Sequence, residues 1–289
     1  MHLLEPLLIS DDIFTRATLL GIERVLTSQT SLLKAHIQNG AGQSALQWLG
    51  APDAWRNLRN AIEKRQPGTG EWLLSSPEFQ AWLSSPQFLW LTGIPGAGKT
   101  ILSSNVIAAL LCQHEHSGNA VVFSYFDFQD SSKQQADTLL RAILAQLAAR
   151  NSEALKSLVE LHNQCAGSRA ASSDELLRAI AASLTYFPKT FIVVDAVDEC
   201  SDRRLLLKHL RAISELPNVH IAAFSRRETD IESALQGIAR EIPLAAAAVD
   251  NDIAMYVKHR IESSDDMAFW APEDKNRVQE NLTSKADGM

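Results

Sequence analysis

Residues 88–104 read FLWLTGIPGAGKTILSS, an apolar run followed by a glycine-rich loop and the start of a second apolar run. The loop, Gly93–Thr100, fits the pattern G-x-x-x-x-G-K-S/T, which marks a phosphate-binding loop when a strand precedes it and a helix follows. Both flanks have the required character, because FLWL predicts a buried strand and ILSSNVIAALL predicts a helix. The sequence therefore predicts a strand–loop–helix unit that holds a nucleotide phosphate.

The residue types in this loop match that chemistry. Glycines allow the backbone to wrap closely around a phosphate and to present N–H groups at a helix N-terminus, where the helix dipole favours anions. We expect Lys99 to reach the β- and γ-phosphates of a nucleoside triphosphate and the Thr100 hydroxyl to ligate Mg²⁺. The predicted cofactor-binding residues are Gly93, Pro95, Gly96, Ala97, Gly98, Lys99 and Thr100.

A second buried strand with an acidic end is predicted by FIVVDAVDE, residues 191–199. It would deliver Asp195 to the carboxyl edge of a parallel sheet, where ligands bind in α/β folds and where Mg²⁺ would lie. Asp198 and Glu199 follow one turn later, and either can polarise the attacking water. Glu199 is the usual candidate for that role, with Asp198 assisting or holding the waters of the metal.

A third element is the predicted strand His220–Phe224, which ends in Ser225-Arg226-Arg227. An arginine at the carboxyl end of a strand can contact the γ-phosphate through a charge-assisted hydrogen bond. Arg226 is predicted for this role, and Arg227 is expected to pair with Glu228. The alternative interpretation is two solvated arginines, since surface arginines usually contribute little.

From Pro86 onward, short β-rich runs alternate with longer helical runs, the pattern of a parallel α/β sheet. The expected strands are Phe88–Leu91, Ala120–Phe126, Phe191–Val194, His220–Phe224 and Glu241–Leu244. Helices are expected between them, from Asp250 to about Ile261 and near Asp274–Leu282. The sequence thus predicts an α/β P-loop NTPase fold with a five-stranded, mainly parallel sheet between helices, preceded by an N-terminal helical segment.

The N-terminal segment has helical periodicity from Asp11 and Asp12 to about Ile37, and Gly40 and Gly42 are expected to stop that helix. Trp48–Ile62 predicts a second helix, and Ser75-Ser76-Pro77-Glu78 predicts the capped start of a third. Five of the six tryptophans fall between residues 48 and 90. Core anchoring explains them better than an aromatic ligand site, because aromatic side chains dominate core burial.

Composition narrows the class of protein. The 289 residues are 46% hydrophobic and 21% charged, which is enough apolar surface for a packed core. A net charge of −7 argues against a nucleic-acid binder or an anionic-membrane binder. Three widely spaced cysteines fit no disulfide framework. The sequence contains neither a secretory leader nor an apolar run that spans a bilayer, so a cytoplasmic location is expected.

Other chemistry-bearing patterns are weaker. Cys112, His114 and His116 mimic a metal cluster, but on a helix His114 points away from the face that the other two share. Incidental polar residues at a helix end explain them better. Asp127 and Asp130 follow a predicted strand and lie at the correct edge for a supporting role, although loop caps are the simpler interpretation.

The order of GIPGAGKT, VVDAVDEC and AFSRRE resembles the NACHT-type P-loop NTPases of the signal-transduction (STAND) class. It is most similar to a fungal set that includes heterokaryon-incompatibility proteins and nephrocystin-3-like N-terminal relatives. GTGEWLLSSPEFQAWL, upstream, is similar to the segment that introduces the NTPase domain there, and the resemblance covers residues 46–289. Pro95 replaces a small flexible residue of the wider class, which is compatible with a rigid loop.

The resemblance implies a site geometry. The arginine-bearing strand would lie between the phosphate-loop strand and the acidic strand, which would place Arg226 beside Lys99 and Asp195. Residues just before the first strand would close over the base and ribose. The candidates are Gly68, Gly70, Glu71 and Trp72, unless GTGEW is only a turn followed by a core tryptophan.

The expected organisation has four parts. They are an N-terminal helical segment (1–45), a Trp-rich helical introduction (46–86), a NACHT-like NTPase domain (87–262) and the truncated start of a further helical region (263–289). Relatives continue into a helical and winged-helix region and a repeat array, so a fragment is expected here. A histidine that the later region contributes to the β-phosphate would then be missing.

The leading functional hypothesis is a signalling switch that binds Mg²⁺ with ATP or GTP and hydrolyses the nucleotide slowly to control oligomerisation. The resemblance links such switches to innate recognition and programmed cell death. The expected partners are a nucleoside triphosphate, other copies of the chain, and an effector domain or protein at the N-terminal helix, but no nucleic acid. Two alternatives stay open: a small-molecule kinase, and an interaction module in which the nucleotide site is structural.

Overall fold

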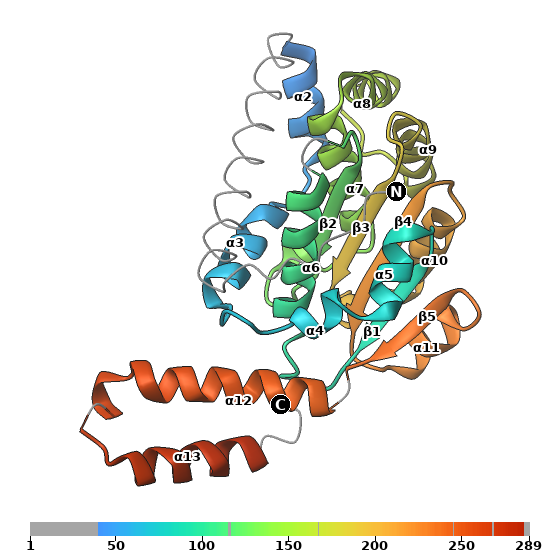
Figure 1. Ribbon diagram of the computed structural model, residues 1–289. Helices are drawn as coiled ribbons and strands as arrows, with labels where there is room; N and C mark the ends of the chain where they lie inside the picture. Colours follow the sequence, from blue (N-terminus) through green and yellow to red (C-terminus); the bar gives the residue numbers. More distant parts are fainter. Residues whose placement is uncertain (1–39, 115–116, 167, 245, 268, 286–289) are drawn as a thin grey trace.

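The computed structural model describes residues 40–114, 117–166, 168–244, 246–267 and 269–285 (Figure 1). The helix expected between Asp11 and Ile37 lies outside the described residues, as does His116. A five-stranded, all-parallel sheet forms the centre, in the order β2-β3-β4-β1-β5. Its strands are β1 Phe88–Thr92, β2 Ala120–Tyr125, β3 Thr190–Asp195, β4 Val219–Ser225 and β5 Ala239–Pro243. The predicted P-loop NTPase-like α/β fold is confirmed.

The strand register brings the chemistry-bearing segments to one edge of the sheet. β4 lies between β1 and β3, as the resemblance implies. Thr92 at the end of β1 is level with Ser225 at the end of β4. Asp195 at the end of β3 is level with Tyr125 at the end of β2. Because all these strands are parallel, the loops that follow them meet at the same carboxyl edge.

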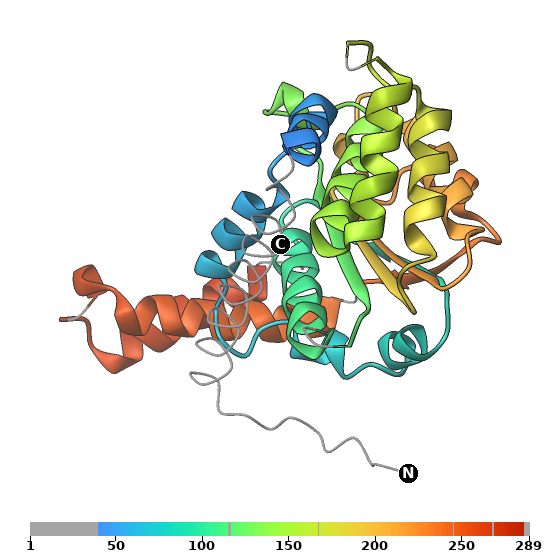
Figure 2. The same ribbon diagram turned by 90° about the horizontal axis from the view of Figure 1, so that it is seen from above.

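Helices cover both faces of the sheet, because successive strand residues point to opposite faces and both sets are apolar (Figures 1 and 2). One face packs against α2 Gly40–Leu49, α7 Asp137–Arg150, α8 Ser152–Gln164, α9 Ser173–Leu184, α10 Arg203–Ser214 and α11 Thr229–Leu235. The other packs against α3 Ala54–Lys64, α4 Glu71–Leu74, α5 Pro77–Ser84 and α6 Lys99–His114. Along β1, for example, Phe88 and Trp90 join the first core and Leu89 and Leu91 join the second.

A helical hairpin follows the sheet. It consists of α12 Ala246–Ser263 and α13 Pro272–Lys285, and it extends away from the carboxyl edge of the strands (Figure 1). Leu244 N–H donates to the carbonyl oxygen of Thr92 at 2.7 Å. This bond holds the segment that leads into the hairpin beside the phosphate loop. Both helices begin earlier than the sequence pattern predicts. Among the residues that the structure describes, no helix is both long and apolar enough to cross a membrane.

The N-terminal prediction was wrong in one respect. Trp48–Ile62 does not form one helix: α2 ends at Leu49, Gly50 adopts a left-handed φ of +58°, and Asp53 caps the start of α3. The Asp53 carboxylate accepts from the N–H groups of Trp55 and Arg56, and this capping bond favours a new helix over continuation. Gly40 and Gly42 lie within α2, and the end of the helix that they were expected to stop falls outside the described residues.

Gly42 packs against α8, where an added Cβ would lie 3.2 Å from Leu155 Cδ2. Glycine at this position therefore allows a close approach between α2 and α8. Three other helices, α4, α8 and α11, were not predicted as separate helices. The strand expected at Glu241–Leu244 begins two residues earlier, at Ala239.

The tryptophan prediction holds for the two that are fully enclosed. Trp82 Nε1–H donates to the carbonyl oxygens of Gln87 and Ile221, and Trp90 Nε1–H donates to Ser225 Oγ. These bonds satisfy the polar edge of each ring inside the core. The cap is also confirmed: Ser76 Oγ accepts from Phe79 N–H, with Pro77 at the first helical position of α5.

Candidate functional site

The glycine-rich loop lies between β1 and the N-terminus of α6. Gly96 and Gly98 have φ values of +83° and +74°, which residues with a side chain rarely adopt. Gly93 meets a spatial limit instead, since an added Cβ would lie 2.9 Å from Leu244 Cδ1. The loop therefore needs glycine at these three positions, and it presents the N-terminus of a 16-residue helix to the carboxyl edge.

Lys99 lies over its own loop. Its Nζ donates to the carbonyl oxygens of Gly93 at 2.8 Å and Ile94 at 2.7 Å. Burial lowers the pKa of the Lys99 ammonium, opposed by the negative charges of Asp198, Asp195 and Glu199. Lys99 is thus held at the loop, and the acids that the sequence singled out act on its charge.

Thr100 and Asp195 are joined directly, with Thr100 Oγ1–H donating to Asp195 Oδ2 at 2.7 Å. Asp195 is only 2% exposed, and its Oδ1 is buried without a hydrogen-bond partner. Burial is the main cause that raises the pKa of Asp195 to about 6. An uncompensated carboxylate oxygen beside a hydroxyl is a donor set that suits Mg²⁺, which binds oxygen ligands. These two residues therefore fit the metal that the fold implies.

Asp198 is bound to Arg226 by both of its oxygens. Arg226 N–H donates to Asp198 Oδ1 at 3.0 Å, and Arg226 Nε lies 3.2 Å from Oδ2. The Asp198 side chain is 7% exposed, whereas that of Arg226 is 45% exposed. Arg226 also lowers the pKa of Lys99 through its charge, so this arginine stands near the phosphate loop. The strand order places Arg226 on β4, between the strands that precede Lys99 and that carry Asp195, and the charges of Arg226 and Asp195 both act on Lys99.

The prediction for the neighbouring arginine was wrong. Arg227 Nη2 pairs with Glu232 Oε1 at 2.7 Å and with Glu241 Oε2 at 3.4 Å, and not with Glu228. Glu228 instead precedes α11, which begins at Thr229, and Glu232 lies one turn into that helix. Glu228 is next to Arg227 in the sequence. The helix α11, which was not predicted, instead brings Glu232 to Arg227.

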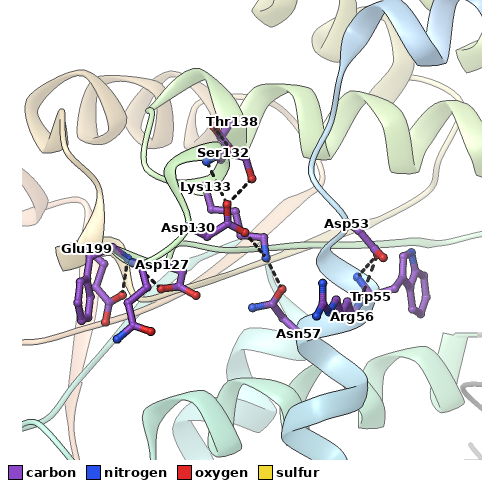
Figure 3. A network of polar contacts seen from close by, with 12 residues as sticks. Asp53, Trp55, Arg56, Asn57, Asp127, Asp130, Ser132, Lys133, Thr138 and Glu199 are labelled. Atoms are coloured by element: carbon purple, nitrogen blue, oxygen red, sulfur yellow. Dashed lines mark hydrogen bonds and ion pairs between the residues drawn. The ribbon is translucent and has the colours of Figure 1, made fainter.

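Glu199 is held by the loop that follows β2 (Figure 3). Its Oε2 accepts from Phe128 N–H at 3.1 Å, and burial raises the pKa of the carboxyl group. Ala196 adopts a left-handed φ of +55° just before the short 3₁₀ turn Val197–Glu199, which redirects the chain after β3. Glu199 therefore has a main-chain donor on one of its oxygens, whereas Asp198 is engaged by Arg226 on both.

The same loop is fastened to α3. Asp127 and Asp130 accept from main-chain N–H groups two residues further on, as the loop-cap interpretation predicts. Lys133 Nζ contacts Asp130 Oδ2 at 3.1 Å and Asn57 Oδ1 of α3 at 2.9 Å (Figure 3). A chain of contacts thus runs from the N-terminal helices to Glu199, and the sequence offered no signal for it because Asn57 and Lys133 are 76 residues apart.

A cavity of about 680 Å³ opens beside the phosphate loop. One wall comes from the segment before β1, a second from the loop and α6, and a third from the hairpin. The lining residues are Lys64, Gln66, Thr69, Gly70, Gly96, Ala97, Gly98, Ile101, Leu102, Asp252, Ile253, Tyr256, Val257, Asn281 and Leu282. The apolar side chains come mainly from α6 and from the hairpin, so the cavity combines an anion-binding end with an apolar body.

The residues predicted to contact the base and ribose do not all line this cavity. Gly70 lines the cavity, whereas Gly68 and Glu71 are not among its lining residues. Trp72 instead donates from Nε1 to Asp252 Oδ2 of α12. Sequence reasoning missed the hairpin residues entirely, because helical periodicity predicts a helix but not the surface on which it packs.

The weak metal pattern at the end of α6 has another explanation. Asn119 Nδ2 lies 3.2 Å from His114 Nδ1, and the His114 ring stacks on Phe191 with centroids 4.7 Å apart. Burial lowers the pKa of His114. In the part of the chain that the structure describes, no group of three His, Cys, Asp or Glu side chains is placed to hold a metal ion. A Mg²⁺ ion held by Thr100 and Asp195 would not require such a group, because Mg²⁺ usually keeps several waters and binds through one or two carboxylates and phosphates.

Comparison with known proteins identifies sequence relatives of the chain. A family model described as Nephrocystin 3, N-terminal matches residues 68–226, more than half of the chain. The matched region contains the phosphate loop, Asp195 and Arg226. Vegetative incompatibility protein HET-E-1 of Podospora anserina is 28% identical over 236 residues, 75% of this chain. The chain spans 17% of the length of that relative.

Proposed function

Because the chain belongs to the nephrocystin 3 N-terminal family, we propose that it is a nucleotide-dependent signalling switch of the NLR-like type. It binds Mg²⁺ with ATP or GTP at the phosphate loop and hydrolyses the triphosphate slowly. The observation that carries this proposal is the convergence of Lys99, the Thr100–Asp195 pair and Arg226 at the N-terminus of α6.

Each residue has a role that its surroundings support. Lys99 exchanges the carbonyl oxygens of Gly93 and Ile94 for the β- and γ-phosphates. Thr100 and Asp195 hold Mg²⁺, which supplies charge neutralisation for the triphosphate when it is bound. Arg226 contacts the γ-phosphate through its exposed guanidinium edge.

Glu199 is the residue that orients and polarises the attacking water. Its carboxyl pKa is raised by burial, which brings it closer to the working range of a general base. Asp198 serves differently, because both of its oxygens are engaged by Arg226. Hydrolysis is slow because stabilisation of the γ-phosphate in the transition state depends on an arginine from a neighbouring copy of the chain.

The nucleoside occupies the cavity next to the loop. Gly96, Ala97 and Gly98 form its phosphate end, and the side chains of Ile101, Leu102 and the hairpin provide an apolar surface for a base. At about 680 Å³ the cavity lies within the size range of small-molecule sites. Self-association and a cytoplasmic setting complete the proposal; the free thiols of Cys165 and Cys200 support a reducing compartment.

Binding of labelled ATP and GTP, with and without Mg²⁺, tests this function. We expect Mg²⁺-dependent binding that Lys99→Ala abolishes and that the exposed-residue control Lys208→Ala leaves unchanged. Nucleotide is expected to change the oligomeric mass in light scattering. Binding that is equal in wild type and Lys99→Ala would refute the phosphate site, and rapid phosphoryl transfer to a metabolite would assign a kinase instead.

A further inference from the structure

Asp252 of α12 reaches across the cavity to the segment that precedes β1. Its Oδ2 accepts from Gly70 N–H at 3.0 Å and from Trp72 Nε1–H at 3.1 Å. The partners are 182 and 180 residues away in the sequence. Asp252 and Gly70 both line the cavity, so this contact joins two of its walls directly.

The Thr69–Gly70 segment, which Asp252 contacts, is itself hydrogen-bonded to α6. Asn105 Nδ2–H donates to the carbonyl oxygen of Thr69 at 3.0 Å. Gly70 has a φ of +77°, and an added Cβ would lie 2.6 Å from Asn105 Nδ2 and 2.7 Å from Leu102 Cδ2. The segment is therefore pressed against the helix that follows the phosphate loop, and it provides a rigid anchor for whatever binds its other side.

The hairpin differs from this segment in its position, because it extends away from the sheet (Figure 1). Its contributions to the cavity follow Asp252 on α12: Ile253 is adjacent, and Tyr256 and Val257 lie about one turn further on. A carboxylate that accepts two N–H bonds in a half-buried place makes stronger hydrogen bonds than a neutral acceptor. Release of Asp252 would free the wall that carries these side chains.

We infer that Asp252 is a positioning residue that assembles the nucleoside part of the binding site by holding α12 against the rigid Thr69–Gly70 segment. The inference rests on the proposed function, because it assigns the cavity to the nucleoside of the bound nucleotide. Asp252 lies outside residues 68–226, the range of the family match. It acts on the base and ribose through the hairpin, and it leaves the phosphate loop untouched.

This separation defines the experiment. Affinities of the full chain are measured for Mg-ATP and for inorganic tripolyphosphate with Mg²⁺, a ligand that has no nucleoside. Asp252→Ala is expected to weaken ATP binding by roughly tenfold or more, the usual scale for losing charge-assisted hydrogen bonds. Tripolyphosphate binding is expected to stay within about twofold of wild type, because that ligand uses only the loop. The control is Glu262→Ala, which removes an exposed acid from the same helix.

Trp72→Phe is a milder second variant, since it removes one donor to Asp252 and keeps an aromatic ring. We expect it to weaken ATP binding less than Asp252→Ala does and to spare tripolyphosphate binding. Unchanged ATP affinity in both variants overturns the inference, as does an equal loss for both ligands. A wild-type chain that binds tripolyphosphate and ATP with equal affinity also overturns it. A wild-type chain that binds neither ligand overturns the proposed function and this inference together.

Discussion

Arg226 engages both carboxylate oxygens of Asp198, one through its main-chain N–H at 3.0 Å and the other through Nε at 3.2 Å. The contact gives two adjacent acids different environments. The side chain of Asp198 is buried, and Arg226 engages both of its carboxylate oxygens. Glu199 instead accepts a hydrogen bond from the main-chain N–H of Phe128, in the loop after β2. The local sequence D-x-x-D-E does not distinguish them, but their partners do.

Removal of the Glu199 carboxylate charge should separate binding from hydrolysis. Glu199→Gln keeps a side chain of the same shape that can still accept from Phe128 N–H. We expect ATP affinity close to that of wild type and a fall in hydrolysis of about 10²-fold or more, the usual contribution of a positioned base. Single-turnover hydrolysis and equilibrium binding measure the two effects. Equal hydrolysis in wild type and Glu199→Gln would remove Glu199 from the mechanism.

Arg226 should distinguish triphosphate from diphosphate. Its guanidinium is partly exposed and close enough to Lys99 to lower the pKa of that lysine. We expect Arg226→Ala to weaken ATP binding by about tenfold and to leave ADP binding nearly unchanged, because only ATP has a γ-phosphate. Titration calorimetry with both nucleotides is the measurement, and Arg211→Ala is the control at an exposed arginine. A parallel loss for ATP and ADP would contradict the γ-phosphate role.

Asp198 should act through that arginine. Asp198→Ala removes both acceptors of Arg226 and leaves its main-chain N–H unpaired. We expect a loss of ATP-over-ADP preference of about the same size as in Arg226→Ala, and little further loss in the double variant, since the two residues act as a unit. A double-mutant cycle on the ATP/ADP affinity ratio measures this coupling. Additive losses would show that the two side chains act independently.

The part of the site that the sequence could predict is the part built from contiguous residues. Gly93–Thr100 fixes its own conformation through glycines and a helix start, and a run of buried residues carries Asp195 to the strand end. The position of Arg226 followed from the family resemblance, which supplied the strand order. These elements could be predicted because their positions depend either on the local sequence or on a strand order that the resemblance supplied.

The missed parts depend on packing between distant segments. Asp252 and Trp72 are 180 residues apart, and helical periodicity around Asp252 predicts only a helix. The break between α2 and α3 was missed for another reason, because Trp48–Ile62 has enough apolar residues for one helix and the Asp53 cap redirects it. Two hydrogen bonds to the Asp53 side chain and a left-handed glycine outweigh the local helix propensity there.

Gly70 should be one of the most sensitive glycines in the chain. Gly70→Ala combines a left-handed φ of +77° with a Cβ placed 2.6 Å from Asn105 Nδ2 and 2.7 Å from Leu102 Cδ2. We expect a loss of about 2–4 kcal/mol in the free energy of unfolding, the sum of backbone strain and a displaced neighbour. Gly118→Ala is the matched control, with a φ of +74° and no atom within 4 Å of the added Cβ. Its cost should be only about 1 kcal/mol. Equal costs in urea unfolding would contradict the close packing.

Asp195 should make stability and Mg²⁺ binding respond to pH in opposite directions. Its folded-state pKa is raised from 3.8 to about 6, chiefly by burial. The folded chain therefore binds more protons than the unfolded chain between these values, so this group favours folding below pH 3.8 and its contribution is lost as pH rises through about 6. Mg²⁺ needs the ionised carboxylate, so its affinity should rise over the same interval.

Asp195→Asn should remove both responses, because an amide does not titrate. Without nucleotide, we expect the variant to unfold at a higher temperature than wild type at pH 7.5, where wild type carries a buried carboxylate with an unpartnered Oδ1. The difference should shrink at pH 5, where the wild-type carboxyl is largely protonated. Adding Mg-ATP should stabilise wild type more at pH 7.5 than at pH 5 and should stabilise Asp195→Asn weakly at both. Thermal unfolding at the two pH values measures each effect.

Asp174→Asn, at a solvent-facing acid in the first turn of α9, is the control. A variant less stable than wild type at pH 7.5 would show that the carboxylate is needed for folding rather than for the metal.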